Sequence, residues 1–585
     1  MRPLKTARWI LRRPDRSTVE ALARRRDLPE VVAGLLVSRG HCEVEAVDVH
    51  LAASPRGLHD PSLLPGMEAA TERLERAVRD GETVLVHGDY DVDGVTGTAL
   101  LMRLLRLVGA RARWHIPNRL VDGYSFGDHS LEKARETGAT VVISVDNGTS
   151  AFETIAALQE RGVDTVVTDH HEPPPPHPEL GALPPAAAVV NPKLEDSTYP
   201  WRELCGGAVA FKLAWGLCQR LSGAQRVRPE FKAFLDDAMA YVAIATVSDV
   251  VPLLDENRIF ARWGLKSLEG TRNPGLRALL TVAGLEGRGL GAEDVAFQIG
   301  PRINASGRLG SAARAVELFL SENLDHALGL ARELDALNQE RRTIEREVLD
   351  QARVEAARFA DPAEHPVLVL AGEGWHQGVV GIVAARLVEE YGRPAVVIGL
   401  DGAEGRGSAR SVPGFSVLEA LHGGAGEVLR YGGHAQAAGL EVRAAAVPAL
   451  REAVCRRARE LLGGAEYPPL ELQIDCELPL ARMTPGLMRH FDRLAPFGER
   501  NEKPVLLSRD LRLSAPPRLV GAERTHLLLR LRQGAVEHKA MGFGMGARAD
   551  ELVMGRPVEA VYTPVWNTFR GETRLELVLH DFRVG

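Results

Sequence analysis

The sequence has no long apolar run. A membrane-spanning helix needs about 20 consecutive apolar residues, and no stretch of these 585 residues approaches that length. The N-terminal segment carries charges but no apolar core of signal-peptide length. Cysteine is scarce, and the five cysteines are scattered without CxxC spacing, at positions 42, 205, 218, 455 and 476. These absences predict a cytoplasmic protein with reduced thiols and no membrane contact.

The chain also lacks a net positive charge. Its formal net charge is −7, which argues only weakly against nucleic-acid binding, because a dense acidic metal site can accompany a basic groove. Hydrophobic residues make up 45% and charged residues 25% of the chain, as in ordinary soluble proteins. A length of 585 residues exceeds what one hydrophobic core can hold and predicts three or four domains.

The most informative segment is His87-Gly-Asp-Tyr-Asp-Val-Asp-Gly94, which follows the apolar run 83–86. Alternate residues of an extended chain face the same way, so Asp89, Asp91 and Asp93 are expected to project together while the strand lasts. Carboxylates packed this closely repel one another unless a cation neutralises them. On its own, the segment is also compatible with a calcium-type or merely acidic loop.

Three further apolar runs end in acidic or histidine residues. The runs 141–145, 165–168 and 241–247 lead into Asp146, Asp169-His-His171 and Asp249. In an open α/β sheet, ligands bind beyond the carboxyl ends of the strands. Six candidate ligands are therefore expected at one edge: His87, Asp91, Asp93, Asp146, His170 and Asp249. Carboxylate and imidazole without thiolate favour Mn²⁺ or Mg²⁺, and six ligands suit a two-metal site that clamps a phosphoryl group.

These motifs resemble a known family. Asp169-His-His171 is similar to the signature of the DHH phosphoesterases. The segments HGDYDVDG, VDNG and SDVVPL are similar to the other metal motifs of that family. Residues 375–382, 407–411 and 431–439 resemble the companion DHHA1 domain. Residues 300–308, GPRINASGR, and 496–501, PFGERN, resemble the RecJ branch, bacterial exonucleases that degrade single-stranded DNA in the 5′→3′ direction. The resemblance runs from about residue 45 to the end.

The resemblance implies roles for the residues of the metal motifs. It implies two ions that share Asp146, one also held by His87 and Asp91 and the other by Asp93, His170 and Asp249. His171 is expected to hydrogen-bond the scissile phosphate or to assist proton transfer. Asp89 and Asp169 are expected to orient histidines from outside the ligand set, with a strand-end cap as the alternative for Asp169.

Polar residues of the other motifs are candidates for holding the DNA backbone. They are Arg119, Arg302, Asn304, Arg308, His376, Gln377, Ser408, Arg410 and His434. A structural ion pair is the alternative for Arg119, Arg302 and Arg308, and single histidines are more often structural. The glycine-rich segment Gly405–Arg410 is predicted to form a turn whose backbone N–H groups help Ser408, Arg410 and Arg119 hold a 5′ phosphate.

The predicted organisation is an α/β protein with two parallel-sheet lobes, DHH and DHHA1, joined by a long helix, and a C-terminal OB-like β-barrel. The expected domains are a basic helical extension (1–65), the DHH lobe (66–270), a helical connector (271–364), the DHHA1 lobe (365–467) and the barrel (468–585). The first lobe is expected to have strands at 84–88, 140–145 and 164–168.

The expected function is hydrolysis of single-stranded DNA from the 5′ end, with release of 5′-mononucleotides. The resemblance also implies a role in DNA repair and recombination, a helicase and a single-strand-binding protein as partners, and a monomeric state. Two alternatives stay open, a DHH phosphodiesterase for short oligonucleotides or cyclic dinucleotides and a non-catalytic DNA-binding scaffold. Retention of every metal carboxylate opposes the scaffold, and the C-terminal barrel favours a polymeric substrate.

Overall fold

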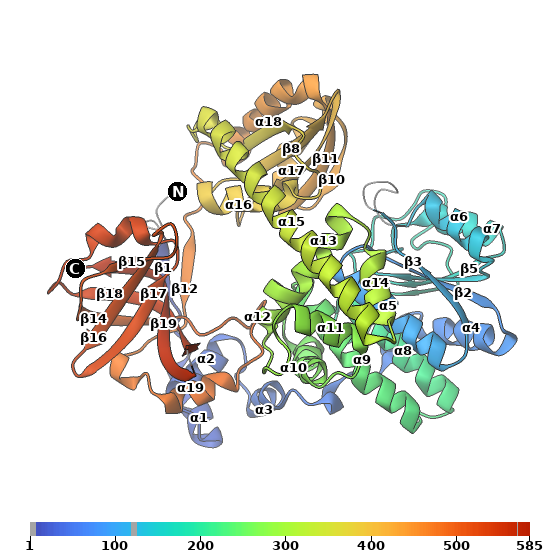
Figure 1. The fold of residues 1–585 in the computed structure, drawn as a ribbon, viewed down its shortest axis with the longest axis horizontal. Helices are drawn as coiled ribbons and strands as arrows, with labels where there is room; N and C mark the ends of the chain where they lie inside the picture. Colours follow the sequence, from blue (N-terminus) through green and yellow to red (C-terminus); the bar gives the residue numbers. More distant parts are fainter. Residues whose placement is uncertain (1–6, 119–125, 570) are drawn as a thin grey trace. The chain divides into compact units, whose positions relative to one another are not determined.

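The structure is a computed structural model, and it describes residues 7–118, 126–569 and 571–585 (Figure 1). The chain divides into two compact units. One contains Ala336–Leu472 with the chain up to Ile10, and the other contains Leu11–Asp335 with Gln473–Gly585. Among the described residues, no helix is both long and apolar enough to cross a membrane.

A parallel five-stranded sheet organises the first lobe. Its strand order is β3-β2-β4-β5-β6, with all neighbours parallel. The strands are β2 (Thr83–Gly88), β3 (Arg111–His115), β4 (Val141–Val145), β5 (Asp164–Thr168) and β6 (Ala188–Val190). The strands predicted at 84–88, 140–145 and 164–168 are confirmed. The central strands are almost wholly apolar because helices cover both faces of the sheet.

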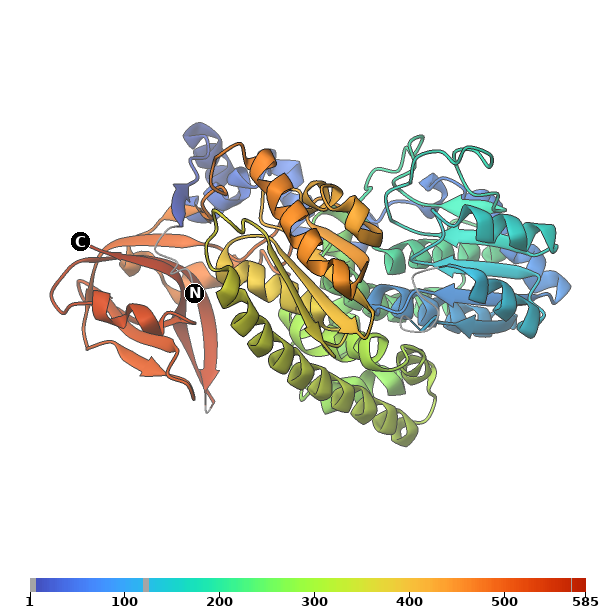
Figure 2. The same ribbon diagram turned by 90° about the horizontal axis from the view of Figure 1, so that it is seen from above.

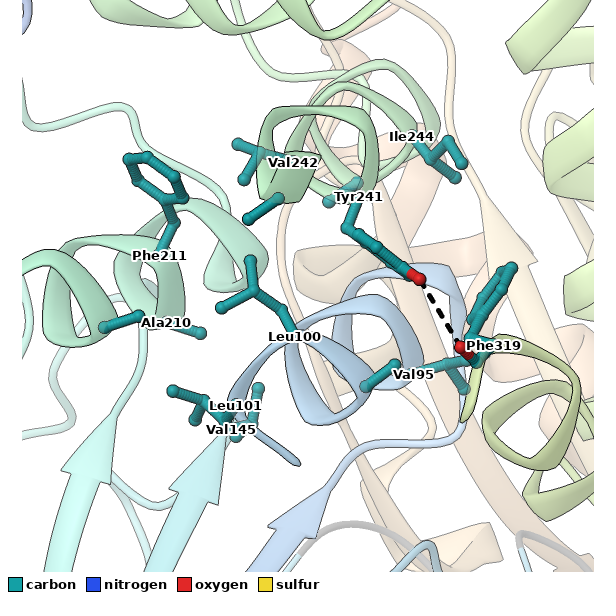
Figure 3. Close-up of a cluster of buried hydrophobic side chains, with 14 of the residues drawn as sticks. Val95, Leu100, Leu101, Val145, Ala210, Phe211, Tyr241, Val242, Ile244 and Phe319 are labelled. Atoms are coloured by element: carbon teal, nitrogen blue, oxygen red, sulfur yellow. Dashed lines mark hydrogen bonds between the residues drawn. The ribbon is translucent and has the colours of Figure 1, made fainter. Parts of the chain in front are cut away.

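Alternate strand residues point to two separate cores. Leu85, Val142 and Val167 face α6 (Asp128–Thr137) and α7 (Phe152–Glu160). The opposite face packs against α4 (Met67–Asp80), α5 (Val92–Leu107) and α8 (Gly206–Ser222), and α9 (Pro229–Ser248) packs on α5 and α8 in the same core. Figure 3 shows side chains of α5, α8 and α9 meeting in this second core, where the Tyr241 hydroxyl donates to the Phe319 carbonyl over 3.4 Å.

The run 241–247 forms a helix, whereas the sequence predicted a strand. It is the C-terminal part of α9, and every residue in it is buried. A short run that is apolar on all sides fits a buried helix as well as a buried strand, so periodicity does not distinguish them. Asp249 therefore comes from the C-terminal end of a helix.

Further helices extend the same core. They are α10 (Asp255–Glu269), α11 (Pro274–Val282), α12 (Ala292–Asp294), the π-helical turn η4 (Val295–Ile299), α13 (Gly300–Leu309) and α14 (Ala313–Leu320). Residues of these helices and of the start of α15 (Leu324–Ala356) belong to the core of the first lobe. The long helix predicted within the connector (271–364) is the 33-residue α15, which follows α14.

The second lobe has a mixed sheet, whereas a parallel one was expected. Its order is β10-β11-β9-β8-β7, and only β7 and β8 are parallel. The strands are β7 (Leu368–Glu373), β8 (Ala395–Asp401), β9 (Glu404–Arg410), β10 (Val428–Gly433) and β11 (Ala437–Arg443). The connection from β8 to β9 is a tight turn, which joins antiparallel strands and is too short for a parallel crossover.

Helices cover both faces of this second sheet (Figure 2). The C-terminal part of α15 and α16 (Val380–Tyr391) pack on one face. On the other face lie α17 (Val417–His422) and α18 (Val447–Leu462). The glycine-rich segment 405–407 belongs to β9 and is not a turn. A Cβ at Gly407 would lie 2.8 Å from Ile398 Cγ1, so glycine makes room there for neighbouring side chains.

The C-terminal part is a β-barrel. Seven strands run in the order β13-β14-β18-β19-β17-β16-β15, and an additional β14–β16 pairing closes the sheet. They are β13 (Cys476–Glu477), β14 (Leu506–Leu513), β15 (Arg518–Val520), β16 (His526–Gln533), β17 (Val536–Gly542), β18 (Val558–Phe569) and β19 (Glu572–Val584). Helix α19 (Pro485–Asp492) precedes β14. The predicted OB-like barrel is confirmed.

The N-terminal segment shares its core with the barrel. Its elements are β1 (Arg8–Leu11), which pairs with β12 (Glu471–Ile474), and helices α1 (Arg16–Arg26), α2 (Glu30–Ser38) and α3 (Val44–Ala52). Leu22, Leu35 and Leu36 are buried in one cluster with Leu480 and Phe491. The segment is helical, as predicted, and it completes the apolar core of the barrel.

Candidate metal centre

The aspartate-rich segment turns from strand to helix. Strand β2 ends at Gly88, and Asp91 caps the N-terminus of α5 by accepting hydrogen bonds from the Asp93 and Gly94 amides at 2.9 and 3.2 Å. The predicted alternation along a strand therefore does not apply beyond Gly88. Asp93 instead lies in the first turn of α5, beside the positive end of the helix dipole.

Two glycine amides hold the Asp93 carboxylate. The N–H groups of Gly206 and Gly207, at the start of α8, donate to its two oxygens over 2.6 Å each. Burial, followed by the charge of Asp91, raises the pKa of Asp93 to about 7. The amides and the dipole of α8 favour the ionised form in opposition to this burial.

Asp146 lies at the centre of the site. It has a left-handed backbone, with φ of 63°, which aspartate tolerates better than most residues. The Ser144 hydroxyl donates to the Asn147 carbonyl over 2.7 Å and fixes this turn. Asp146 Oδ1 is buried and receives no hydrogen bond from the described residues, although His170 Nε2 lies 3.1 Å away. Burial and the charges of Asp93 and Asp91 raise the pKa of Asp146 well above its usual range.

Potential ligand atoms gather in three overlapping groups at this edge of the sheet. Within each group, the atoms lie within 4.8 Å of one another. The groups are Asp93 with His170 and Asp249, Asp146 with His170 and His171, and Asp89 with Asp91 and Asp146. The 3.1 Å approach of His170 to Asp146 joins the first and the last of these groups. Burial, then the neighbouring Asp93, raises the pKa of Asp249 to about 8.

The structure places His87 in another cluster and Asp89 among the candidate ligands. His87 is fully buried, and its Nε2 lies 3.0 Å from Ser130 Oγ. Its ring groups with His115 and His129, whereas Asp89, predicted to lie outside the ligand set, groups with Asp91. The physical reason is that His87 still belongs to β2 and pairs in register with His115 of β3, while Asp89 follows the end of the strand.

Asp169 holds the turn that carries the two histidines. Its Oδ1 accepts from the His170 and His171 amides at 2.8 and 3.1 Å and lies 2.7 Å from His171 Nδ1. Asp169 is therefore both a cap and an orienting group, the two alternatives raised for it. Its hydrogen bond raises the pKa of His171 to about 9. Burial, then the neighbouring His171, lowers the pKa of His170 to about 3.

Comparison with known proteins identifies the family. Three family descriptions match: the DHH family N-terminal domain over residues 83–246, the DHHA1 domain over 364–460 and the RecJ OB domain over 474–581. The chain is 33% identical over 574 residues to the single-stranded-DNA-specific exonuclease RecJ of Escherichia coli, across 95% of this chain and 96% of that protein. The chain belongs to the RecJ family.

Other RecJ proteins show the same relationship. RecJ of Bacillus subtilis is 34% identical over 579 residues, which are 99% of this chain and 71% of that protein. The crystal structure of RecJ from Thermus thermophilus in complex with Mn²⁺ matches with a TM-score of 0.82 and 31% identity. The match covers 100% of this chain and 80% of that chain. These likenesses support the fold throughout the two lobes and the barrel.

The GPRINASGR segment of this RecJ-family chain supports the aspartate turn. Asn304, in α13, accepts a hydrogen bond from the Val92 amide over 3.2 Å, at the start of α5. Arg302 Nε lies 2.9 Å from Asp335 Oδ1, the structural ion pair considered as its alternative. Arg308 is half-buried on the same helix. Arg119, the remaining arginine of the predicted set, lies outside the described residues.

The predicted binding residues of the second lobe lie mainly near the start of α16. Arg410 Nη1 donates to Ser408 Oγ over 2.8 Å. A Cβ at Gly381, in the first turn of α16, would lie 3.0 Å from Ser408 Oγ and 3.2 Å from Arg410 Nη2. Just before this helix, His376 Nδ1 accepts from the Gly378 amide over 3.0 Å. Gln377 is half-buried and His434 is exposed.

The segment predicted to form an anion-binding turn is a strand instead. The backbone of Gly405–Arg410 pairs with β8 on one side and with β11 on the other. Its amides therefore serve the sheet and are not free to hold a phosphate. The side chains of Ser408 and Arg410 remain as the candidate donors of this segment.

Sequence reasoning missed the Gly206–Gly207 pair. The two glycines open α8 directly after Cys205, and a Cβ at Gly206 would lie 2.6 Å from Asp146 Oδ1. Adjacent glycines before an apolar run were the available signal of close backbone approach.

Proposed function

We propose that this chain is a metal-dependent exonuclease that degrades single-stranded DNA in the 5′→3′ direction and releases 5′-mononucleotides. The observation that carries the proposal is the pair of ligand groups joined around Asp146, in a chain whose full-length relatives are named single-stranded-DNA-specific exonucleases. The C-terminal barrel supports a polymeric substrate, because OB folds combine a backbone groove with stacking surfaces for bases.

The residues present fit two Mn²⁺ or Mg²⁺ ions. Asp93, Asp146, His170 and Asp249 would hold one ion, and Asp89, Asp91 and Asp146 the other. Asp146 Oδ1 is buried without a hydrogen-bond donor among the described residues, and burial and neighbouring carboxylate charges raise the pKa of Asp146. A cation would neutralise such a site. When bound, the ions would neutralise charge on the phosphate and activate water. His87 is not part of this proposed set.

The chain's own residues would position the scissile phosphate. His171 has a side chain that is 59% exposed, and Asp169 fixes its ring through Nδ1. The charged imidazole is suited to contact a phosphate oxygen from outside the ligand set. The N-terminus of α5 provides further positive potential beside the aspartates.

The second lobe would contribute the grip on the DNA. Ser408 and Arg410 present a hydroxyl and a guanidinium next to each other, which suits a terminal 5′ phosphate, with His376, Gln377 and His434 along the remaining backbone. We further propose that the protein acts as a cytoplasmic monomer beside a helicase and a single-strand-binding protein. The helicase would supply unpaired strands.

The test uses the full chain with strands labelled at the 5′ or the 3′ end. With Mn²⁺ or Mg²⁺, a 5′-labelled strand should release labelled mononucleotide at once, while a 3′-labelled strand should shorten progressively. EDTA should abolish both signals. A trinucleotide compared with a long strand separates a polymer nuclease from an oligonucleotide phosphodiesterase. Early mononucleotide release from the 3′ label would refute the polarity, and no metal-dependent release from either strand would refute the nuclease itself.

A further inference from the structure

Three histidines meet beside the aspartate cluster. His87 of β2 pairs in register with His115 of β3, and His129 comes from the first turn of α6. The ring centroid of His87 lies 5.1 Å from that of His115 and 5.4 Å from that of His129, and the centroids of His115 and His129 are 5.7 Å apart. One ring nitrogen from each residue lies within 4.8 Å of the other two. Three separate elements thus bring imidazoles together.

The surroundings of His87 suit a ligand held ready for an ion. The side chain is fully buried, Ser130 Oγ lies 3.0 Å from Nε2, and Phe126 packs edge-on at 4.8 Å. Nδ1 is buried without a hydrogen-bond partner among the described residues. A buried polar atom in this state is unfavourable unless water or an ion satisfies it. A hydrogen bond at one ring nitrogen fixes the orientation of a histidine and leaves the other nitrogen to bind a metal.

We propose that His87, His115 and His129 form a second metal site, distinct from the oxygen-rich centre and selective for a Zn²⁺-like ion. Imidazole ligands suit Zn²⁺ and related transition metals, whereas Mg²⁺ and Mn²⁺ prefer carboxylate, carbonyl and water oxygens. The group contains no carboxylate, so the two centres differ in the ion that each selects. The ion would link β2, β3 and α6, and a water would complete its coordination.

The experiment measures zinc binding by the full chain in the presence of excess Mg²⁺. Equilibrium dialysis followed by metal analysis compares wild type with His115→Gln and His129→Gln. The matched control is His326→Gln, which changes an exposed histidine on α15. Wild type and the control should retain about one more equivalent of Zn²⁺ than either variant at the same free zinc concentration. Equal zinc content in all four folded proteins would overturn the proposal.

A second measurement requires no variant. X-ray absorption of wild type carrying one equivalent of Zn²⁺, again with excess Mg²⁺, should show imidazole scattering with Zn–N distances of about 2.0–2.1 Å. A first shell dominated by oxygen would place the zinc in the carboxylate centre and overturn the proposal. Neither readout depends on DNA cleavage. The nuclease assay described above tests the proposed function separately from this zinc site.

Discussion

The Gly206–Gly207 pair offers the sharpest test of how the fold positions the metal ligands. Gly206→Ala adds one methyl group at the start of α8. That Cβ would lie 2.6 Å from Asp146 Oδ1 and 2.7 Å from Asp146 Cβ, closer than non-bonded atoms approach. Either Asp146 or the helix terminus must shift, and a shift of the helix also disturbs the 2.6 Å hydrogen bond to Asp93.

The expected size of the Gly206→Ala effect follows from the free-energy cost of overpacking. Extra methyl groups at well-packed positions cost about 1–3 kcal/mol. If this cost falls on the metal-loaded state, kcat/KM or Mn²⁺ affinity should fall by roughly one to two orders of magnitude. The disturbed residue is the proposed shared ligand, so raising the Mn²⁺ concentration should recover part of the activity. A purely structural lesion would not show that metal dependence.

The matched control is Gly216→Ala, in the same helix. A Cβ there would meet Met67 Sδ at 3.0 Å, the movable end of a side chain outside the metal centre. The assay measures nuclease rate against Mn²⁺ concentration for both variants and wild type, with melting temperatures recorded alongside. A folded Gly206→Ala protein whose rate and Mn²⁺ requirement match those of the control would refute the positioning argument.

Three other changes have defined outcomes. Asp146→Ala should abolish hydrolysis but leave single-strand binding, measured by fluorescence anisotropy, because most affinity comes from other phosphate contacts; substantial residual turnover would contradict the shared-ligand assignment. Arg410→Ala should slow cleavage of 5′-phosphorylated strands by roughly one to two orders of magnitude, as loss of about 1.5–3 kcal/mol implies, and should hardly affect 5′-hydroxyl strands; equal loss on both would exclude end recognition. Deleting 468–585 should lower solubility as well as long-strand affinity, because Leu22 and Leu35 lose their buried partners; a soluble product with unchanged melting would refute the shared core.

The sequence predicted the elements whose residues are locally distinctive. The aspartate and histidine motifs after β2, β4 and β5 lie together because parallel strands deliver their carboxyl ends to one edge. Asp249 was predicted at the same place for the wrong structural reason. Its preceding run is buried on every side as a helix, and such a run has no period that separates helix from strand.

The remaining features depend on contacts between distant segments. His87 and Asp89 are two residues apart, yet the end of β2 between them decides which cluster each joins. The role of Gly206–Gly207 appears only when α8 is placed against Asp93. Similarly, the glycines of β9 indicate a turn in the sequence. In the structure, side chains of the adjacent strands leave no room for a Cβ at these positions. Tertiary packing, not local preference, fixes these details.

The acidic centre also makes folding stability depend on metal and pH together. Burial raises the pKa of Asp93 to about 7 and that of Asp249 to about 8, so the metal-free native state binds more protons than the unfolded chain between about pH 4 and pH 8. These groups therefore stabilise the metal-free fold less as pH rises through that window. Metal ions bind the deprotonated carboxylates, so the stabilisation of the fold by bound metal grows as pH rises. The difference in melting temperature between Mn²⁺-loaded and chelated protein should widen from about pH 5 to about pH 8, and a difference that narrows would contradict ligation by these carboxylates.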